Sequence, residues 1–384
     1  MNRRMDVLIT FAIMIAGLAG RNALASCQIG NPAEGNPSLT TPAISVVPLA
    51  ASISAPADLP VGTVLYRGAF QAIWRVNIIC TQSGAFYKQL KVIDSGADIG
   101  SVDDFNVPAT LITSGSRVYT TSLPGVGVAF NTGAQGNNLV SAASCSDSIS
   151  CFFFGSVSTG EVIGAEYTLS MLLIKTTSGP VTPGIINGES LPSFERLYGQ
   201  ADSMVVVQKS SLKGSVTVTA PTCTTPDVKV MMGTWDASQF AGKGSGTEWQ
   251  DASIRMTGCG QFHGYYAGHT QVNGGAVSSN GPATPNKYIF TLTPLSTIID
   301  NTNGIMAVDA GESSAGGVGI QIGIGSLTSA ASYLIKFNRG YSAYLSDSGF
   351  TSMSIPLAAR YVQTGERITG GTANGKVTFT VQYK

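Results

Sequence analysis

The chain has 384 residues, and its 22 Lys and Arg residues balance 22 Asp and Glu residues, so the formal net charge is zero. Only 11% of the residues are charged, about half the usual share, whereas 43% are hydrophobic and 46 are glycine. This composition excludes global disorder, and the absence of a basic cluster argues against a nucleic acid partner. The length predicts two domains, and with only two histidines in the chain we expect neither a metal nor another cofactor.

Residues 1–25 are predicted to form a signal peptide. Arg3 and Arg4 supply its basic start, an apolar stretch runs from Val7 to Ala19, and Ala23-Leu24-Ala25 supplies a small-residue cleavage motif. The apolar stretch is shorter than the ~20 residues that span a bilayer, which argues against a membrane anchor. We therefore expect an exported protein.

Six cysteines in an exported chain favour disulfides over metal ligands. Six cysteines allow fifteen connectivities, but their placement suggests three local pairs. No CxxC motif occurs, which counts against a zinc site. The expected pairs are Cys27–Cys80, Cys145–Cys151 and Cys223–Cys259.

Short apolar or alternating runs bounded by Gly, Pro, Asn or Ser predict β-strands along the first half of the chain. They are Val61–Tyr66, Ala72–Ile79, Val126–Phe130, Tyr167–Ile174 and Met204–Val207. Such spacing is typical of an antiparallel sandwich or barrel. The polar stretch Gln208–Ser215 is a predicted linker between two cysteine-paired blocks. We expect an all-β chain with domains at 26–210 and 211–384.

Motifs for catalysis are weak in this sequence. His263 and His269 would lie roughly 20 Å apart in a strand, too far for one metal. Gly242–Gly246 lacks the spacing of a phosphate-binding loop, and no Gly-x-Ser-x-Gly motif occurs. The adjacent carboxylates of Asp103 and Asp104 would point to opposite sides of a strand. We do not expect an enzyme.

The last eight residues, Val377–Lys384, alternate strictly between apolar and polar side chains. In a strand, Val377, Phe379, Val381 and Tyr383 would share one face, with Thr378, Thr380, Gln382 and Lys384 on the other. The final strand of any sandwich could show this pattern, so its meaning depends on the rest of the block.

The second block resembles the subunits of chaperone–usher pili. The penultimate Tyr383 and Gly371, fourteenth from the end, match the C-terminal pattern of that family. The other stretches that carry the resemblance are Tyr361–Gly365, Val216–Cys223 (the first pilin strand running into its cysteine), Cys259 and Gly316–Ile322. The resemblance covers only this block.

The resemblance implies an immunoglobulin-like sandwich that lacks its seventh strand. A partner would fill the apolar groove along the open edge by adding a strand. The implied partners are a periplasmic pilus chaperone, an outer-membrane usher and the donor strand of the next pilus subunit. The implied interaction residues are Gly371, Val377, Phe379, Val381, Tyr383 and Lys384. Basic residues of the chaperone would hold the terminal carboxylate of Lys384.

The resemblance also implies a tip adhesin, because in that family a chain with a domain ahead of its pilin block has no free donor strand and occupies the fibre tip. In the front block, the stretches Ser26–Gly30 and Ala57–Leu65 resemble two-domain tip adhesins, closer to type 3 fimbriae than to the mannose-binding type 1. Cys80 is followed by Thr81-Gln82-Ser83, so mannose specificity is not expected. We expect attachment to a host glycan, a matrix protein or another surface from the fimbrial tip. The alternatives are a non-binding tip adaptor or assembly initiator, and an exported carbohydrate-active enzyme.

Sugar pockets usually need a few convergent polar groups beside an aromatic face. The candidates for a receptor pocket are Tyr87, Asp103, Asp104, Asn106, Arg117 and Tyr119, with Trp74 and Phe152–Phe154 as further contributors. Packing in the core or solvation of a loop is the competing role for each of them.

Overall fold

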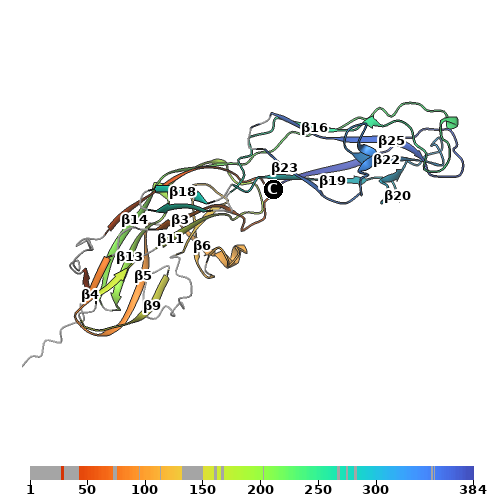
Figure 1. Ribbon diagram of the computed structural model, residues 1–384. Coiled ribbons are helices and arrows are strands. Elements are labelled where there is room, and N and C mark those ends of the chain that lie inside the picture. The colour runs from red at the N-terminus through yellow and green to blue at the C-terminus, as the bar shows by residue number, and fades with distance from the viewer. Residues whose placement is uncertain are drawn as a thin grey trace, which may run out of the picture.

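The computed structural model describes residues 27–29, 43–71, 76–94, 96–112, 114–131, 150–159, 162–165, 168–201, 203–265, 269–273, 276–280, 283–346, 349 and 351–384. Their regular structure consists of β-strands and short 3-10 helices, so the all-β prediction is confirmed. Two elongated bodies lie end to end, and the C-terminus lies where they meet (Figure 1). The predicted signal peptide, 1–25, lies outside the described residues.

The front body is built on two large sheets and one small one. The first large sheet has the order β18 (Ala276–Asn280), β17 (His269–Asn273), β3 (Val64–Gln71), β11 (Thr168–Lys175), β8 (Val126–Asn131), β7 (Arg117–Thr120) and β6 (Asp98–Ser101). The second has the order β12 (Gly184–Asn187), β14 (Ser203–Thr219), β13 (Ser193–Gln200), β5 (Gly84–Asp94) and β9 (Ser150–Val157), with β2 (Ala43–Ser54) parallel to β14. The small sheet has the order β1 (Cys27–Ile29), β4 (Val76–Cys80) and β10 (Val162–Ala165), and the 3-10 helices are η1 (Val102–Phe105) and η3 (Gly188–Ser190).

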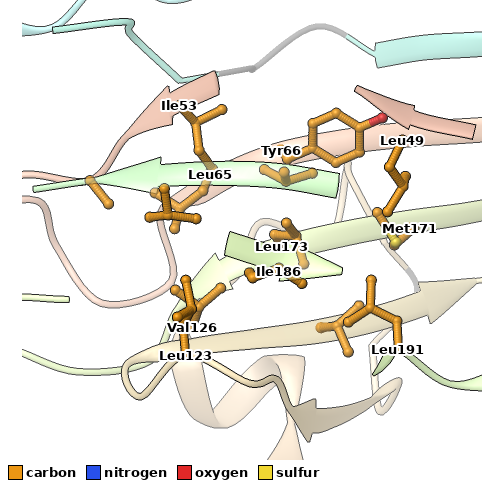
Figure 2. Close-up of a cluster of buried hydrophobic side chains, with 14 of the residues drawn as sticks. Leu49, Ile53, Leu65, Tyr66, Leu123, Val126, Met171, Leu173, Ile186 and Leu191 are labelled. Carbon is orange, nitrogen blue, oxygen red and sulfur yellow. The ribbon is translucent and has the colours of Figure 1, made fainter. Parts of the chain in front are cut away.

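The main core of the front body draws on both large sheets. Figure 2 shows Leu49 and Ile53 of β2 close to Met171 and Leu173 of β11, with Ile186 of β12 in the same cluster. Each of these side chains is at most 3% exposed. Burying one contributes roughly 1.5–3 kcal/mol relative to leaving it in water, so this cluster holds the two sheets together.

Several predicted strands coincide with observed ones, with changes at their ends. Val126–Phe130 lies in β8, and the described part of Tyr167–Ile174 lies in β11. The prediction of a strand from Val61 is wrong at its start, because Val61 and Gly62 form a turn and β3 begins at Val64. Gly62 has φ +81°, and a Cβ there would meet the Phe105 carbonyl oxygen, so the chain turns before the strand starts.

The predicted linker at Gln208–Ser215 is wrong. These residues form the middle of β14, which pairs with β13 on one side and runs parallel to β2 on the other. Gln208 and Leu212 are buried whereas Lys209 and Lys213 are exposed, so the polar composition reflects a strand with one solvated face. The stretch pairs with β2 along its whole length, with β13 as far as Ser210 and with β12 at Ser215, and this pairing favours strand over coil.

The end of β14, which the resemblance places in the second block, pairs with strands of the front body. Val216–Thr219 runs parallel to β2, and Val216–Val218 also pairs with β12. The hairpin of β17 and β18 also belongs to the front sheet, where β17 runs parallel to β3. The division of the chain in space therefore differs from its division in sequence.

The second body contains three sheets. The largest has the order β15 (Gln250–Asp251), β25 (Leu357–Gln363), β22 (Val318–Ile324), β21 (Ile305–Ala307) and β20 (Ile298–Asp300). The others have the order β23 (Tyr341–Tyr344), β19 (Lys287–Pro294), β26 (Val377–Tyr383), and the pair β16 (Ile254–Thr257) and β24 (Ser352–Ile355). The 3-10 helices are η4 (Ala237–Gln239) and η5 (Ala330–Ser332). The stretch Gly316–Ile322 supplies most of β22, the central strand, whose residues are buried up to Gly323.

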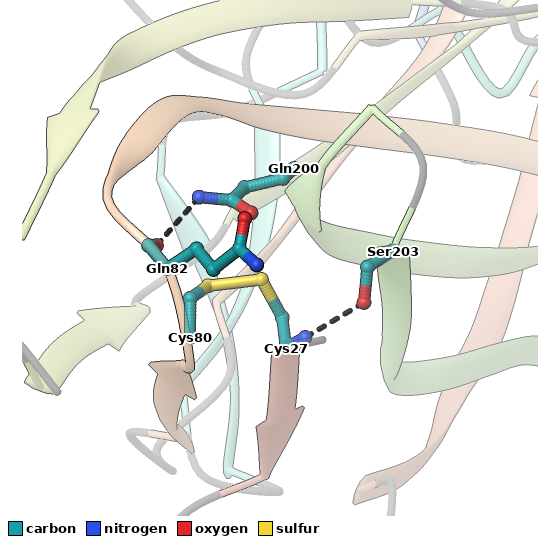
Figure 3. Close-up of a disulfide and its surroundings, with 5 residues drawn as sticks. All are labelled: Cys27, Cys80, Gln82, Gln200 and Ser203. Atoms are coloured by element: carbon teal, nitrogen blue, oxygen red, sulfur yellow. Dashed lines mark hydrogen bonds between the residues drawn. A yellow bond between two sulfur atoms is a disulfide. The ribbon is translucent and has the colours of Figure 1, made fainter. Parts of the chain in front are cut away.

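Each body contains a disulfide, and both pairs are among those expected from the sequence. Cys27–Cys80 joins β1 to β4, where the Cys27 N–H donates to Ser203 Oγ at 2.7 Å (Figure 3). Cys223–Cys259 belongs to the core of the second body. Such a cross-link stabilises by roughly 2–4 kcal/mol, mainly by restricting the unfolded chain. Cys145 of the third expected pair lies outside the described residues.

Candidate functional site

The strand β26 forms the edge of its sheet. It pairs antiparallel with β19 and ends the three-stranded order, so within the described residues its other side has no strand partner. Val377, Phe379 and Val381 are half-buried against the core, whereas Thr378 and Thr380 are exposed. The alternation in the sequence thus corresponds to one face on the core and one face in water.

The register of β26 identifies which backbone groups face the open edge. Lys384 and Lys287 exchange both hydrogen bonds, at 2.7 and 2.5 Å. Because antiparallel pairs alternate between bonded and non-bonded positions, the backbone groups of 378, 380 and 382 also face β19. The N–H and C=O groups of Val377, Phe379, Val381 and Tyr383 therefore point away from the sheet.

A groove of about 480 Å³ lies along this open edge. One wall is β26, from Val377 to Val381, and the other includes Thr225 and Asp227. Thr225 and Asp227 lie in a segment that belongs to no strand. This segment follows Cys223, which forms a disulfide with Cys259. Within the part of the chain that the structure describes, half-buried apolar side chains thus adjoin backbone groups that no strand pairs, which is what an added β-strand requires.

Tyr383 fixes the C-terminal end of β26 in the core. Its ring is 6% exposed and stacks on Phe262, with centroids 5.5 Å apart, and its hydroxyl contacts Met256 Sδ at 3.4 Å. Burial raises the pKa of Tyr383, and hydrogen bonds to the Thr225 side chain and the Cys223 backbone oppose this shift. The penultimate tyrosine is thus a structural anchor beside the groove.

Gly371 lies outside β26, in the segment that precedes it. A Cβ at this position would meet the Ser313 carbonyl oxygen at 2.5 Å and the Ala315 nitrogen at 2.6 Å. The neighbouring Thr372 pairs with Ser314 in an isolated bridge. Gly371 therefore permits two backbone segments to approach closely rather than lining the groove.

Five of the six receptor candidates lie in one segment of the front body, from η1 to β7. The Asp103 carboxylate accepts hydrogen bonds from Ser114 Oγ and the Gly115 N–H, at 2.7 and 2.8 Å. The Asp104 carboxylate accepts bonds from the Ser101 N–H and hydroxyl, at 2.7 and 2.9 Å. These bonds lower the pKa of Asp104. Both acidic side chains stabilise the fold of this segment.

The other residues of this group have similar local roles. Arg117 forms a bidentate pair with Asp98, both distances being 2.7 Å. Asn106 ends η1 in the left-handed conformation, with φ 56°. Tyr119 is 8% exposed and packs in the main core, and burial raises its pKa. The geometry of the segment is set by its own polar contacts.

The remaining candidates are not brought to this group by the strand pairing. Tyr87 lies in β5 of the second large sheet, where it pairs with β9 and β13. Trp74 lies outside the described residues, and Phe152–Phe154 lie in β9. A separate hollow of about 560 Å³ in the front body is lined by Asn187, Glu189, Ser190, Gly214 and Ser215, which sequence reasoning missed.

Sequence reasoning also missed the groove residues Thr225 and Asp227. No motif marks them, because they line the groove through the path of the chain after Cys223. The described residues include no group of three or more His, Cys, Asp or Glu side chains placed to hold a metal ion. Among the same residues no helix has the length and apolar character needed to cross a membrane.

Known proteins with similar sequences include a family model and a curated relative. The sequence profile of the family Fimbrial protein matches residues 210–384. A curated Fimbria adhesin protein of Klebsiella pneumoniae is 23% identical over 337 residues, which cover 85% of this chain and 87% of the relative.

The chain is also similar to solved structures of adhesins. The CupB6 tip adhesin of Pseudomonas aeruginosa has a TM-score of 0.31 and 14% identity, with 93% of each chain covered. The receptor binding domain of the adhesin MrkD1P of Klebsiella pneumoniae has a TM-score of 0.27 and 18% identity, covering 52% of this chain and 98% of that domain.

Proposed function

We propose that the chain is the tip adhesin of a chaperone–usher fimbria, because the model of the family Fimbrial protein matches residues 210–384. The observation that carries the proposal is the groove beside β26, where half-buried apolar side chains adjoin an unpaired strand edge. Such an edge is an aggregation hazard unless a partner strand covers it. The donor strand of the next fimbrial subunit is the occupant, and a periplasmic chaperone strand precedes it during assembly at the usher.

The front body supports the tip position. In a shaft subunit, the segment ahead of the pilin body would have to be free to complete a neighbour. Here β14 leads into the second body while paired with β2, β12 and β13, so this segment cannot act as a donor strand. The chain thus receives a strand without supplying one from this position, which suits the end of a fibre.

The attachment role is assigned to the front domain, residues 26–210, whose strand β14 continues to Thr219. The Fimbria adhesin protein of Klebsiella pneumoniae, which resembles most of this chain, supports this role. A host glycan or matrix protein is the proposed receptor. The chain acts without catalysis and without a cofactor, and it reaches the fimbrial tip by export through the periplasm after removal of residues 1–25.

Donor-strand completion is tested with the full mature chain and a synthetic peptide of alternating valine and threonine. Without peptide or chaperone the chain should aggregate. With the peptide it should become monomeric and unfold at a higher temperature, because the strand covers the apolar edge. If the chain alone is monomeric and the peptide changes nothing, the groove is not a strand acceptor.

Attachment is tested by applying the peptide-completed chain to glycan and matrix-protein arrays. Binding to one class of ligand identifies the receptor. Alanine variants of Glu189 and of Arg117 then distinguish the hollow near η3 from the segment between η1 and β7. Failure to bind any ligand, together with fewer fimbriae on deletion of the gene, would favour an assembly initiator. Turnover of a glycoside would indicate an enzyme.

A further inference from the structure

The end of the groove nearest Tyr383 is closed by the front body. The Asp58 carboxylate accepts a hydrogen bond from the Tyr383 N–H at 2.9 Å, although the two residues are 325 positions apart. This N–H is one of the groups that face the open edge of β26. Asp58 therefore occupies a bonding position that an added strand would otherwise use.

The loop that carries Asp58 is held firmly by the front body. Leu59 is 3% exposed and packs in the main core, and the Ala55 N–H donates to the Thr219 carbonyl at 2.7 Å. The Gly62 N–H donates to the Lys175 carbonyl at 2.8 Å. Asp58 thus projects from a loop that is fixed at both ends.

A buried cation lies close enough to influence Asp58. Lys175 has no exposed surface, and its Nζ donates to the Thr177 and Gly179 carbonyls at 2.5 and 2.8 Å. Burial lowers the pKa of Lys175, and the Asp58 carboxylate opposes this shift. The opposite charges of Lys175 and Asp58 therefore attract each other.

A second contact fixes the two bodies relative to each other. Ser54, which is fully buried, donates its N–H to the Gly264 carbonyl and accepts the His263 N–H at its hydroxyl, both at 2.8 Å. The adjacent Phe262 stacks on Tyr383. The segment 262–264 therefore links β2 of the front body to the residue that Asp58 caps.

We propose that Asp58 is a stop that sets the length and register of the strand received beside β26. The inserted strand then bonds to Val377, Phe379 and Val381 and ends before Tyr383. This inference rests on the proposed function, since it presumes a donor strand in the groove. It assigns part of the strand specificity to the front body instead of to the fimbrial domain alone.

The test uses the full mature chain and two peptides of alternating valine and threonine. The short peptide ends opposite Val381, and the long one continues to the next bonding position, opposite Tyr383. In the wild-type chain the two peptides should bind equally, because the Tyr383 N–H is already bonded. In Asp58→Ala the long peptide should bind about fivefold more tightly, since one additional backbone hydrogen bond can form.

Asp58→Asn is the matched control, because its amide oxygen can still accept the Tyr383 N–H. It should behave like the wild type. If the wild type and Asp58→Ala preferred the long peptide equally, the proposed role of Asp58 as a stop would be overturned. Failure of both peptides to bind the wild type would instead contradict the proposed function.

Amide hydrogen exchange of the chain completed with the short peptide provides a second measurement. In the wild type, the Tyr383 amide should exchange slowly although the short peptide ends before it, because Asp58 accepts its hydrogen bond. Asp58→Ala should accelerate exchange of the Tyr383 amide alone. The exchange rates of the Gln382 and Lys384 amides, which face β19, should stay unchanged. Rapid exchange of Tyr383 in the wild type would show that the cap does not form and would overturn the proposal.

Discussion

Tyr383 combines three separate contacts in one residue. Its ring packs on Phe262, its hydroxyl contacts Met256, and its N–H reaches Asp58 of the front body. The sequence marks this tyrosine through its place in the terminal alternation, but only its side-chain burial follows from that pattern. The backbone contact depends on the front body.

At the residue scale, Gly371 should be intolerant of any side chain. Gly371→Ala places a Cβ against the backbone of Ser313 and Ala315, so it should lower the free energy of unfolding by roughly 1–3 kcal/mol. Gly370→Ala is the control, because a Cβ there meets nothing within 4 Å. Urea unfolding of the peptide-completed chain measures both. Equal effects of the two variants would contradict the close approach.

The Asp98–Arg117 pair should make a small, pH-dependent contribution to stability. The hydrogen bond from Arg117 lowers the pKa of Asp98 below its ordinary value of 3.8. The contribution is therefore fully present above that value and is lost as the pH falls through the lower folded pKa. Because both side chains are at least 40% exposed, Asp98→Asn should cost less than about 1 kcal/mol at pH 7.

Urea unfolding at a series of pH values measures this difference between wild type and Asp98→Asn. The gap should stay constant from neutral pH to about pH 5 and close below pH 3.8. A gap that widens on acidification would contradict the assigned direction of the pKa shift.

At the element scale, β14 and β26 show how much a two-residue period can reveal. In β26 the period is complete and predicts the buried face. In β14 the polar residues Lys209 and Lys213 alternate with the buried Gln208 and Leu212, so the composition of the stretch suggested a linker. The distinction depends on partner strands on both sides, which a local window does not contain.

The two faces of β26 should respond differently to charge. Phe379→Asp and Val381→Asp place a carboxylate against the core beside the groove, so each should weaken binding of the valine–threonine peptide at least tenfold, the desolvation cost being several kcal/mol. Thr380→Asp is the control on the exposed face and should change the affinity little. Fluorescence anisotropy with a labelled peptide measures all three. Equal losses of peptide affinity in all three variants would show that the two faces of β26 contribute alike to peptide binding.

At the scale of the whole molecule, hydrogen bonds join the two bodies at their junction. The contacts of Ser54 and Asp58 bring residues of the front body to the segment 261–264 and to β26. The hairpin β17–β18 adds a further connection through β3. These contacts predict two bodies held in a defined orientation.

Ser54→Ala should loosen that orientation. It removes the acceptor of the His263 N–H in a buried position, at a cost of about 1–3 kcal/mol to the junction. Small-angle scattering of the peptide-completed chain should then show a broader distribution of interatomic distances. Ser52→Ala, on the same face of β2 but exposed, is the control and should leave the distribution unchanged. If Ser54→Ala and Ser52→Ala gave the same distribution of interatomic distances, the Ser54 contact would not define the orientation of the two bodies.

The sequence alone was sufficient for the features that depend on local geometry. Alternation over Val377–Tyr383 determines one buried face, because successive side chains of a strand point to opposite sides. The spacing of the cysteines suggested Cys27–Cys80 and Cys223–Cys259, both of which the structure contains. The resemblance of the C-terminal block agrees with the family match over residues 210–384.

Only the tertiary structure decided which strands pair and which residues meet across the junction. The continuation of β14 to Thr219, the addition of β17 to the front sheet and the contact between Asp58 and Tyr383 join residues far apart in the chain. Their formation depends on the free energy of burying whole faces against one another, summed over both bodies. That sum has no counterpart in any short stretch of sequence, so the alternation predicted a strand at the C-terminus but not what closes its end.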